Sequence, residues 1–217
     1  MRQRIILIVA IVLAVGYGWL RGAFVTLGGA DAAAAQQTTV PGGLQKAIFA
    51  AGCFWCVESD FDKVKGVVET ISGYTGGRVR NPTYEQVSSG TTGHTEALEV
   101  VFDPAVVTYE QLLDHFWHNV DPFAANRQFC DVGAQYRPEI FVQGAAQRAA
   151  AEASKTRMQQ RFKERIVVPI TDAAPFYRAE AYHQDYYKTH SIQYRYYRWR
   201  CGRDARLEEI WRGRTES

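Results

Sequence analysis

Apolar positions recur along the chain in two patterns, one typical of strands and one typical of helices. A short apolar run over residues 45–52 closes on a glycine and predicts a buried strand, and apolar positions at helical spacing follow it over residues 54–66. Alternating patterns predict two more strands, over residues 67–77 and over residues 94–104, the latter stopped by an Asp-Pro pair. A strand is therefore expected to feed directly into a helix near Cys53.

The second half of the chain continues the same alternation. Residues 108–120 form an amphipathic pattern opened by Thr108, with a glutamine three residues on as in a capping box. Residues 145–162 predict a long helix between strand candidates at 139–143 and 165–172. Helices alternate with strands, and some strands follow each other directly. This order predicts an α+β fold, a two-layer α/β sandwich with a ferredoxin-like core on a mixed sheet.

The first 35 residues differ in composition from the rest. An uncharged stretch over residues 5–20 lies between arginines and is short for a membrane span, and a small-residue context resembling a signal-peptidase site follows. We predict that residues 1–35 are a signal peptide that exports the protein to a periplasmic or other extracytoplasmic location. The alternative is an uncleaved membrane anchor formed by residues 5–20.

The remaining chain divides by composition into three parts. Residues 36–45 lack apolar periodicity and are expected to be a linker, residues 46–190 to be the catalytic domain, and residues 191–217 to be a solvated C-terminal tail. With 217 residues, 47% of them apolar, the chain can bury one core. The 25 basic and 23 acidic residues provide no basic field for nucleic-acid binding, so nucleic acid is excluded as a partner and a monomer is expected.

Four cysteines carry the candidate chemistry: Cys53, Cys56, Cys130 and Cys201. Export would permit disulfides, but four cysteines are too few to serve as the scaffold of a domain this long. Cys53 is expected at a helix start, where the dipole and free backbone N–H groups favour a thiolate. Gly52 allows a close approach of the backbone, and Phe54 and Trp55 can wall a pocket. These features favour a nucleophile over a buried apolar filler.

The C-x-x-C spacing permits other functions. One is a thioredoxin-like dithiol/disulfide oxidoreductase that uses Cys53 and Cys56. Another is half of a zinc site, but Cys130 and Cys201 lie far apart in sequence, so no metal is predicted. His115 and His118 share a helix that has the pattern of a core element, and they do not supply the missing ligand pair. A cysteine hydrolase would pair Cys53 with a histidine such as His94 or His183.

Five further segments decide among these functions: GCFWC at 52–56, GYTGGRVRNPTYEQVSSGTTGHTEALEVVFDP at 73–104, FWHNVDP at 116–122, FCDVGAQYRPEIF at 129–141 and AEAYHQDYY at 179–187. In this order they resemble peptide methionine sulfoxide reductases of the A type over residues 46–190. The resemblance implies reduction of the S epimer of methionine sulfoxide, free or in oxidised proteins that are thereby repaired. It also implies no bound cofactor and an external, thioredoxin-like thiol reductant.

The resemblance also implies roles for single residues. Cys53 matches the nucleophile of the family, Phe54 and Trp55 its methyl-binding wall, Glu96 its acid, and Tyr84, Asp131 and Tyr136 its polar partners, with His94 and His183 as supporting hydrogen-bonding groups. The residue types suit the chemistry on their own account. A sulfoxide has a polar oxygen beside an apolar methyl group, so its pocket needs aromatic walls and proton donors. A carboxylic acid with a raised pKa can protonate the oxygen as the thiolate attacks.

The resolving thiol is the point where the sequence departs from many family members. Many have glycine at the position of Cys56 and two cysteines in the tail, where this chain has Cys201 alone. A Cys53 sulfenic acid must condense with a second thiol. We predict that Cys201 approaches on a flexible tail, because a Cys53–Cys56 bond would strain the first helical turn. Cys56, or a relay from Cys56 to Cys201, is the alternative, and Cys130 has no better claim.

Overall fold

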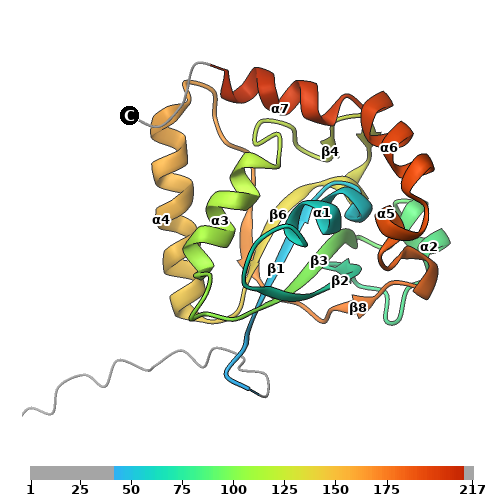
Figure 1. Ribbon diagram of the computed structural model, residues 1–217, viewed down its shortest axis with the longest axis horizontal. Coiled ribbons are helices and arrows are strands. Elements are labelled where there is room, and N and C mark those ends of the chain that lie inside the picture. Colours follow the sequence, from blue (N-terminus) through green and yellow to red (C-terminus); the bar gives the residue numbers. More distant parts are fainter. Residues whose placement is uncertain (1–41, 213–217) are drawn as a thin grey trace, which may run out of the picture. The chain divides into compact units, whose positions relative to one another are not determined.

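A six-stranded sheet organises the computed structural model, which describes residues 42–212 (Figure 1). Its strands lie in the order β7-β6-β1-β3-β2-β8. Their bounds are β1 (Gln45–Ala51), β2 (Val67–Thr75), β3 (Thr95–Phe102), β6 (Pro138–Val142), β7 (Ile170–Asp172) and β8 (Tyr177–Arg178). Two short strands, β4 (Arg127–Gln128) and β5 (Asp131–Val132), pair separately.

The four central strands confirm the predicted ferredoxin-like core. The chain runs through β1, α1, β2, β3, α3 and β6, and the strands lie in the order β6-β1-β3-β2, so the fourth strand lies beside the first. Each neighbouring pair in this group is antiparallel. The added strand β7 pairs parallel to β6, which makes the whole sheet mixed, as predicted.

Seven α-helices occur among the described residues: α1 (Phe54–Phe61), α2 (Tyr84–Ser88), α3 (Tyr109–His118), α4 (Ala145–Arg161), α5 (Tyr186–Thr189), α6 (Ser191–Arg200) and α7 (Arg203–Trp211). The predicted capping box opens α3. The Gln111 N–H donates to the Thr108 hydroxyl at 3.3 Å, and the Thr108 N–H donates to the Gln111 side chain at 2.8 Å. Two N–H groups at the helix start are thereby satisfied.

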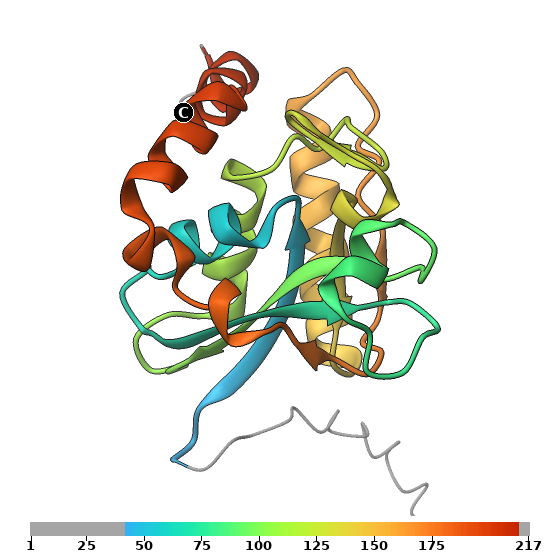
Figure 2. The same ribbon diagram turned by 90° about the vertical axis from the view of Figure 1, so that its right-hand side faces the viewer.

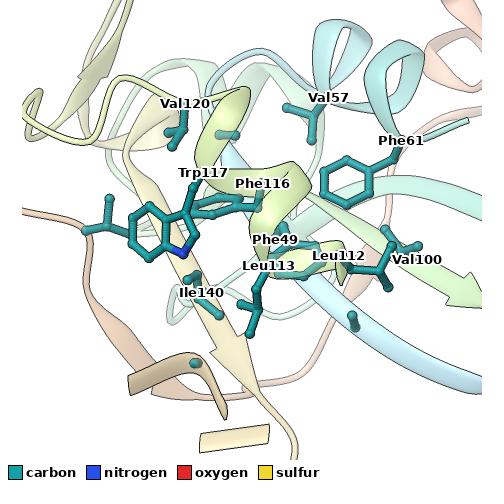
Figure 3. Packing of buried hydrophobic residues seen from close by; sticks show 14 of the residues in the cluster. Phe49, Val57, Phe61, Val100, Leu112, Leu113, Phe116, Trp117, Val120 and Ile140 are labelled. Atoms are coloured by element: carbon teal, nitrogen blue, oxygen red, sulfur yellow. The ribbon is translucent and has the colours of Figure 1, made fainter. Parts of the chain in front are cut away.

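The main core lies between one face of the sheet and helices α1, α3 and α4 (Figure 3). Phe49 of β1 stacks against Phe61 of α1 with ring centroids 5.1 Å apart and against Phe116 of α3 at 5.4 Å. Each fully buried aromatic side chain contributes about 2–3 kcal/mol through the hydrophobic effect. The opposite face, at Phe141, is covered by the segment that contains Phe176 rather than by a helix. The result is the two-layer arrangement that the pattern predicts.

The prediction of a flexible, solvated tail is wrong for residues 191–212. This segment forms α6 and α7, and Figure 2 shows both helices along one side of the domain, with α6 on the side of α1. Arg203, at the start of α7, is 2% exposed, and Tyr194 and Ile210 are also buried. The tail is therefore a packed part of the catalytic domain.

Two other predictions differ from the structure or fall outside it. The strand candidate at 165–172 is a strand only over β7, because the proline at 169 cannot donate to a sheet ladder. The signal or anchor at 1–35 and most of the linker at 36–45 lie outside the described residues. Within residues 42–212, no helix combines the length and the apolar character that crossing a bilayer requires.

Candidate active site

The junction between β1 and α1 places Cys53 at the start of the helix. Gly52 has φ +89°, and a Cβ on it would lie 2.6 Å from Cβ of Gln128, so a larger residue would be both strained and obstructed. Cys53 is the N-cap of α1, and its carbonyl accepts hydrogen bonds from the N–H groups of Cys56 at 3.0 Å and Val57 at 3.3 Å. The close backbone approach expected of Gly52 is confirmed, with Gln128 as the neighbour.

One small cavity of about 80 Å³ unites the predicted site residues. Its lining consists of Cys53, Phe54, Trp55, Tyr84, Glu96, Asp131, Tyr136 and Tyr197. These residues come from the α1 start, α2, β3, the segment around β5 and α6, so five separate parts of the chain meet here. The structure thus brings together the seven residues proposed as catalytic or substrate-binding and adds an eighth, Tyr197.

Glu96 lines the cavity, and its carboxyl group is the acid of the site. It is 2% exposed on β3, and its Oε2 accepts a hydrogen bond from the Phe54 N–H at 3.0 Å. Burial raises the pKa of Glu96 to about 8, although the bond from Phe54 opposes the rise. At neutral pH this carboxyl group carries a proton that it can donate to an oxygen atom in the cavity.

The two free cysteines differ in their ionisation. Burial raises the pKa of the Cys53 thiol well above its usual value, and contact with Cys56 and the acidic groups of Glu96 and Asp131 add to the rise. The pKa of Cys56 is lowered, first by a hydrogen bond from Cys53 and then by Arg203 and Arg198. The expectation that the helix start favours a thiolate at Cys53 is therefore wrong for the resting site. Glu96 takes the first N–H of α1 instead.

Contacts with Tyr186 and His183 hold the aromatic wall of the cavity, Phe54 and Trp55, in place. Trp55 stacks on Tyr186 at 3.8 Å, and its indole N–H donates to Nδ1 of His183 at 3.1 Å. Burial lowers the pKa of His183, which keeps the ring neutral and able to accept this bond. Phe54 lies at 4.9 Å from the same ring. His183 is a supporting group, as predicted.

His94 also serves a supporting role, because it fixes the loop after β2. Its Nδ1 accepts from the Gly77 N–H at 3.1 Å, so its Nε2 carries the proton and donates to the Val79 carbonyl at 2.7 Å. A Cβ on Gly77 would lie 2.3 Å from the His94 backbone nitrogen, so the loop is closely packed here. Neither His94 nor His183 is bonded to Cys53, which removes the base that a cysteine hydrolase needs.

The polar side of the cavity consists of neutral tyrosines and Asp131. Burial raises the pKa of Tyr84 to about 12 and raises the pKa values of Tyr136 and Tyr197 further, so all three keep their O–H protons. The Tyr197 hydroxyl donates to Oδ2 of Asp131 at 2.6 Å. Tyr197 is not among the site residues expected from the sequence, because the composition of its segment predicts a solvated tail. The signal was present, since Tyr194, Tyr197 and Cys201 recur at helical spacing.

Cys130 and Cys201 form a disulfide beside this cavity. It joins residues 71 positions apart, and Cys130 is exposed. Both sulfur atoms lie within 4 Å of carboxylate oxygens of Asp131, at 3.7 Å and 3.9 Å. Cys201 is therefore held by Cys130 and is not free on a mobile tail, while Cys56 lies one turn after Cys53, and its N–H donates to the Cys53 carbonyl at 3.0 Å. No metal site is built from the histidines considered above, because His115 bonds the Asp60 carbonyl at 3.1 Å and His118 bonds Asp114 in its own helix.

Comparison with known proteins shows which family has a site of this kind. The family model for peptide methionine sulfoxide reductase matches residues 45–215. The chain belongs to this family. It is therefore a methionine sulfoxide reductase, and the thioredoxin-like, zinc-binding and hydrolase alternatives are set aside.

Relatives of this reductase cover its catalytic part. The peptide methionine sulfoxide reductase MsrA of Listeria innocua is 49% identical over 172 residues, which is 78% of this chain and 97% of that protein. The MsrA/MsrB protein of Vibrio cholerae is 50% identical over 168 residues, which is 76% of this chain and 44% of that longer protein.

Solved structures of reductases show the same fold. Mxr1 of Saccharomyces cerevisiae in its reduced form matches with a TM-score of 0.66 and 30% identity, over 71% of this chain and 90% of that chain. Methionine sulfoxide reductase A of Corynebacterium diphtheriae matches with a TM-score of 0.62 and 33% identity, over 68% of this chain and 76% of that chain. The predicted α+β fold class is confirmed.

Proposed function

We propose that this reductase acts on the S epimer of methionine sulfoxide, free or in proteins, through a sulfenic acid on Cys53 and a disulfide with Cys56. The observation that carries the proposal is the cavity in which Cys53, the aromatic pair Phe54 and Trp55, and the protonated Glu96 meet. The aromatic side suits the methyl group of the substrate. The polar side suits the sulfoxide oxygen, and a fixed arrangement of both sides around one sulfur selects one epimer.

The first step transfers oxygen from substrate to enzyme. The Cys53 thiol loses its proton to solvent and its sulfur attacks the sulfoxide sulfur, forming an S–S bond, while Glu96 gives its proton to the oxygen, with Tyr84 and Tyr136 as further hydrogen-bond donors. The oxygen then passes to the Cys53 sulfur, both the S–S bond and the S–O bond of the substrate break, and methionine leaves. The sulfenic acid Cys53–SOH has gained the oxygen, and solvent returns the proton to Glu96.

The second step forms a disulfide and releases water. The Cys56 thiolate attacks the Cys53 sulfenic sulfur, and the hydroxyl group leaves with one proton as water. Cys56 is a free thiol one turn after Cys53, whereas Cys201 is bonded to Cys130. We therefore assign direct resolution to Cys56 in place of Cys201, and a relay to Cys201 would be a later exchange. An external dithiol of the thioredoxin type then reduces the Cys53–Cys56 disulfide and is itself oxidised, without a prosthetic group.

The decisive experiment measures reduction of each purified epimer with dithiothreitol as reductant. The parent is expected to consume the S epimer and leave the R epimer. Cys53→Ser is expected to lose the activity and keep the near-UV circular dichroism of the parent, because its hydroxyl cannot accept the oxygen. Retained turnover in Cys53→Ser would remove the assigned nucleophile. Consumption of the R epimer alone would overturn the proposed specificity.

We further propose export, on the composition of residues 1–35 alone. The intact mass of the protein from its native soluble and membrane fractions tests this proposal. A soluble species that lacks about the first 35 residues is expected. A full-length species confined to the membrane fraction would support the anchor instead, and a full-length species in the soluble cytoplasmic fraction would refute both.

A further inference from the structure

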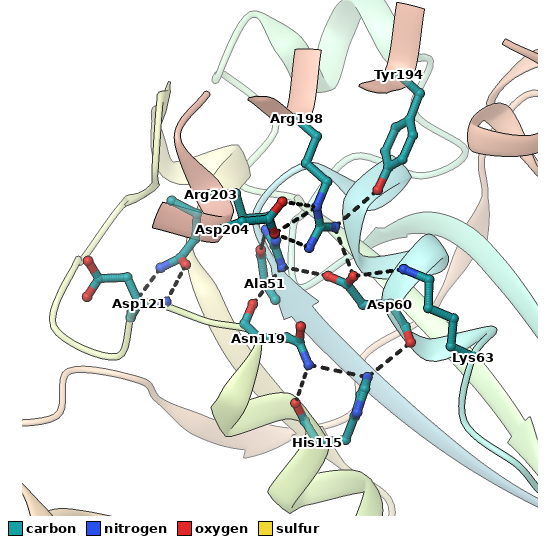
Figure 4. Close-up of polar contacts among 11 residues, drawn as sticks. Ala51, Asp60, Lys63, His115, Asn119, Asp121, Tyr194, Arg198, Arg203 and Asp204 are labelled. Atoms are coloured by element: carbon teal, nitrogen blue, oxygen red, sulfur yellow. Dashed lines mark hydrogen bonds and ion pairs between the residues drawn. The ribbon is translucent and has the colours of Figure 1, made fainter. Parts of the chain in front are cut away.

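A buried cluster of charges joins the tail helices to the catalytic helix (Figure 4). Asp60 of α1 is 5% exposed, and its carboxylate faces two arginines from the tail. Nη1 of Arg198 donates to Oδ1 of Asp60 at 2.8 Å, and Nη2 of Arg203 lies 3.4 Å from Oδ2. The ion pairs span 138 and 143 residues in sequence, so the tail reaches back to the first helix.

Arg203 extends beneath the turn that carries Cys53. Its guanidinium donates to the Ala51 carbonyl at 3.1 Å and to the Asn119 carbonyl at 2.6 Å, and it lies 4.6 Å above the Phe129 ring. A Cβ on Gly52 would be 3.9 Å from its Nη1. The positive charge is therefore buried directly behind the catalytic turn, where solvent screens it poorly.

Both arginines of the cluster meet the same carboxylate. Arg198 and Arg203 share the buried Asp60, and Arg198 also binds Asp204, whose side chain is 67% exposed, at 2.6 Å. Cys56 precedes Asp60 by four residues on α1, so the two side chains lie on the same face, one turn apart. The two guanidinium groups therefore lie on the side of α1 that carries Cys56.

We propose that Arg198 and Arg203 are positioning residues for resolution: they hold Cys56 as the thiolate that attacks the Cys53 sulfenic acid. This inference rests on the proposed function and assigns to the tail helices a part in the reaction. Neither arginine lines the substrate cavity, so each acts through Cys56 rather than on the substrate.

Several groups besides the arginines face Cys56, and their charges set the direction of the effect. The groups are Cys53 at the α1 start, Asp60 on α1, Glu96 on β3, and Tyr194 and Tyr197 on α6. The Cys53 hydrogen bond and the two arginines lower the pKa of Cys56, whereas burial and Asp60 raise it. Glu96 is protonated at neutral pH and both tyrosines are neutral, so the arginines are the main charges that favour the thiolate.

The test removes the positive charge of Arg198 and keeps a long, unbranched side chain at this position. Arg198→Met is compared with Arg198→Lys, which keeps the charge, and with Arg195→Met, an exposed arginine of the same helix whose Nε bonds only its own helix at Ser191. In a Cys53→Ser background with the Cys130–Cys201 disulfide intact, thiolate absorbance against pH reports Cys56 alone. Arg198→Met is expected to shift the titration upward by about one pH unit, whereas the other two variants stay near the parent.

A kinetic readout in the chain that retains Cys53 gives the second arm. After one equivalent of methionine sulfoxide, disulfide formation in Arg198→Met is expected to be about fivefold slower at pH 7, with the difference closing as pH rises. Arg203→Met is expected to act in the same direction, and its near-UV circular dichroism identifies a folding defect. An unshifted Cys56 titration in folded Arg198→Met would overturn the inference, and so would Arg198→Lys behaving like Arg198→Met. Failure to form any sulfenic acid would count against the proposed function instead, because the titration needs no substrate.

Discussion

Two cysteine pairs lie close to Asp131 in environments that differ in almost every respect. Cys53 and Cys56 are 7% and 2% exposed, free, and separated by one helical turn. Cys130 and Cys201 are bonded to each other, reach the surface at Cys130, and come from segments 71 residues apart. The first pair belongs to the substrate cavity. The second pair fastens α6, which carries Tyr197 and Arg198, to the segment that carries Asp131.

The difference shows that the surroundings of a cysteine, and not its residue type, determine its function. A thiol that must become a sulfenic acid and then a disulfide benefits from a dry cavity with proton donors at fixed positions. A disulfide that fixes a helix needs neither. Mutations in the two pairs should therefore separate the loss of chemistry from the loss of stability.

The largest effect is expected from Cys56→Ser. This variant should release one equivalent of methionine per enzyme and then stop under thioredoxin-coupled conditions, because Cys53–SOH forms but finds no adjacent thiol. Cys201→Ser should keep most of the coupled turnover. Peptide mapping after one equivalent of substrate measures the outcome: a Cys53–Cys56 crosslink is expected in the parent and in Cys201→Ser. A Cys53–Cys201 crosslink in Cys56→Ser, with sustained turnover, would return the resolving role to the tail.

Glu96→Gln should slow the reductase step by about a hundredfold at pH 7, because the amide cannot transfer a proton. Burial raises the pKa of Glu96 to about 8, so the acid form is present below that value and is lost above it. The reductase rate of the parent should therefore fall as pH rises through about 8, because Glu96 loses the proton that it donates. Single-turnover rates of methionine release from pH 6 to 10 should show a variant-to-parent gap that narrows with pH. A constant gap would assign Glu96 a purely structural role.

Loss of the Cys130–Cys201 disulfide should act on stability more than on chemistry. Closing a loop of 71 residues is worth about 4 kcal/mol in the chain-entropy treatment of the unfolded state. For a chain of this size that corresponds to a fall in Tm of about 10 °C. Differential scanning calorimetry of Cys201→Ser without reductant measures it, with the parent in dithiothreitol as the matched comparison. An unchanged Tm together with lost activity would reverse the division between the two pairs.

The smallest effect is expected from Tyr197→Phe. The variant loses the hydroxyl that bonds Asp131 at 2.6 Å but keeps the ring that packs edge-on against Trp55 at 5.8 Å. Asp131 lines the cavity, so loss of the bond that orients it should lower kcat/KM about tenfold; a hydrogen bond to a charged group also contributes about 1.5 kcal/mol to stability, so Tm should fall by about 4 °C. Steady-state kinetics on a short peptide substrate measures this. A fall in Tm without a kinetic change would make Tyr197 a packing residue only.

Much of the catalytic half could be predicted because local signals and the fold agree there. The apolar run ending at Gly52 predicts a strand that feeds a helix, and the capping box at Thr108 predicts where α3 begins. The segments that resemble the family placed seven side chains in one cavity. The ferredoxin-like strand order follows from the alternation of strands and helices.

The tail could not be predicted in the same way, because its stability comes from distant partners. The helical spacing of Tyr194, Tyr197 and Cys201 does not indicate where the helix packs, and a central buried side chain is Arg203, a residue type that is almost never buried unless paired. Its partners Ala51, Asp60 and Asn119 belong to β1, α1 and the end of α3. No pattern within 20 residues of Arg203 indicates them. The raised pKa of Cys53 was missed for a similar reason, since burial outweighs the helix dipole.

The small volume of the cavity has a consequence for the proteins that this enzyme repairs. About 80 Å³ between Trp55, Tyr197 and Glu96 admits the end of one side chain and no folded surface around it. A sulfoxide buried in another protein can reach Cys53 only while its segment is locally open. The rate of repair then follows the opening equilibrium of the damaged segment. Oxidised methionines in segments that open often are reduced first, and those in stable cores are reduced only when the surrounding structure opens.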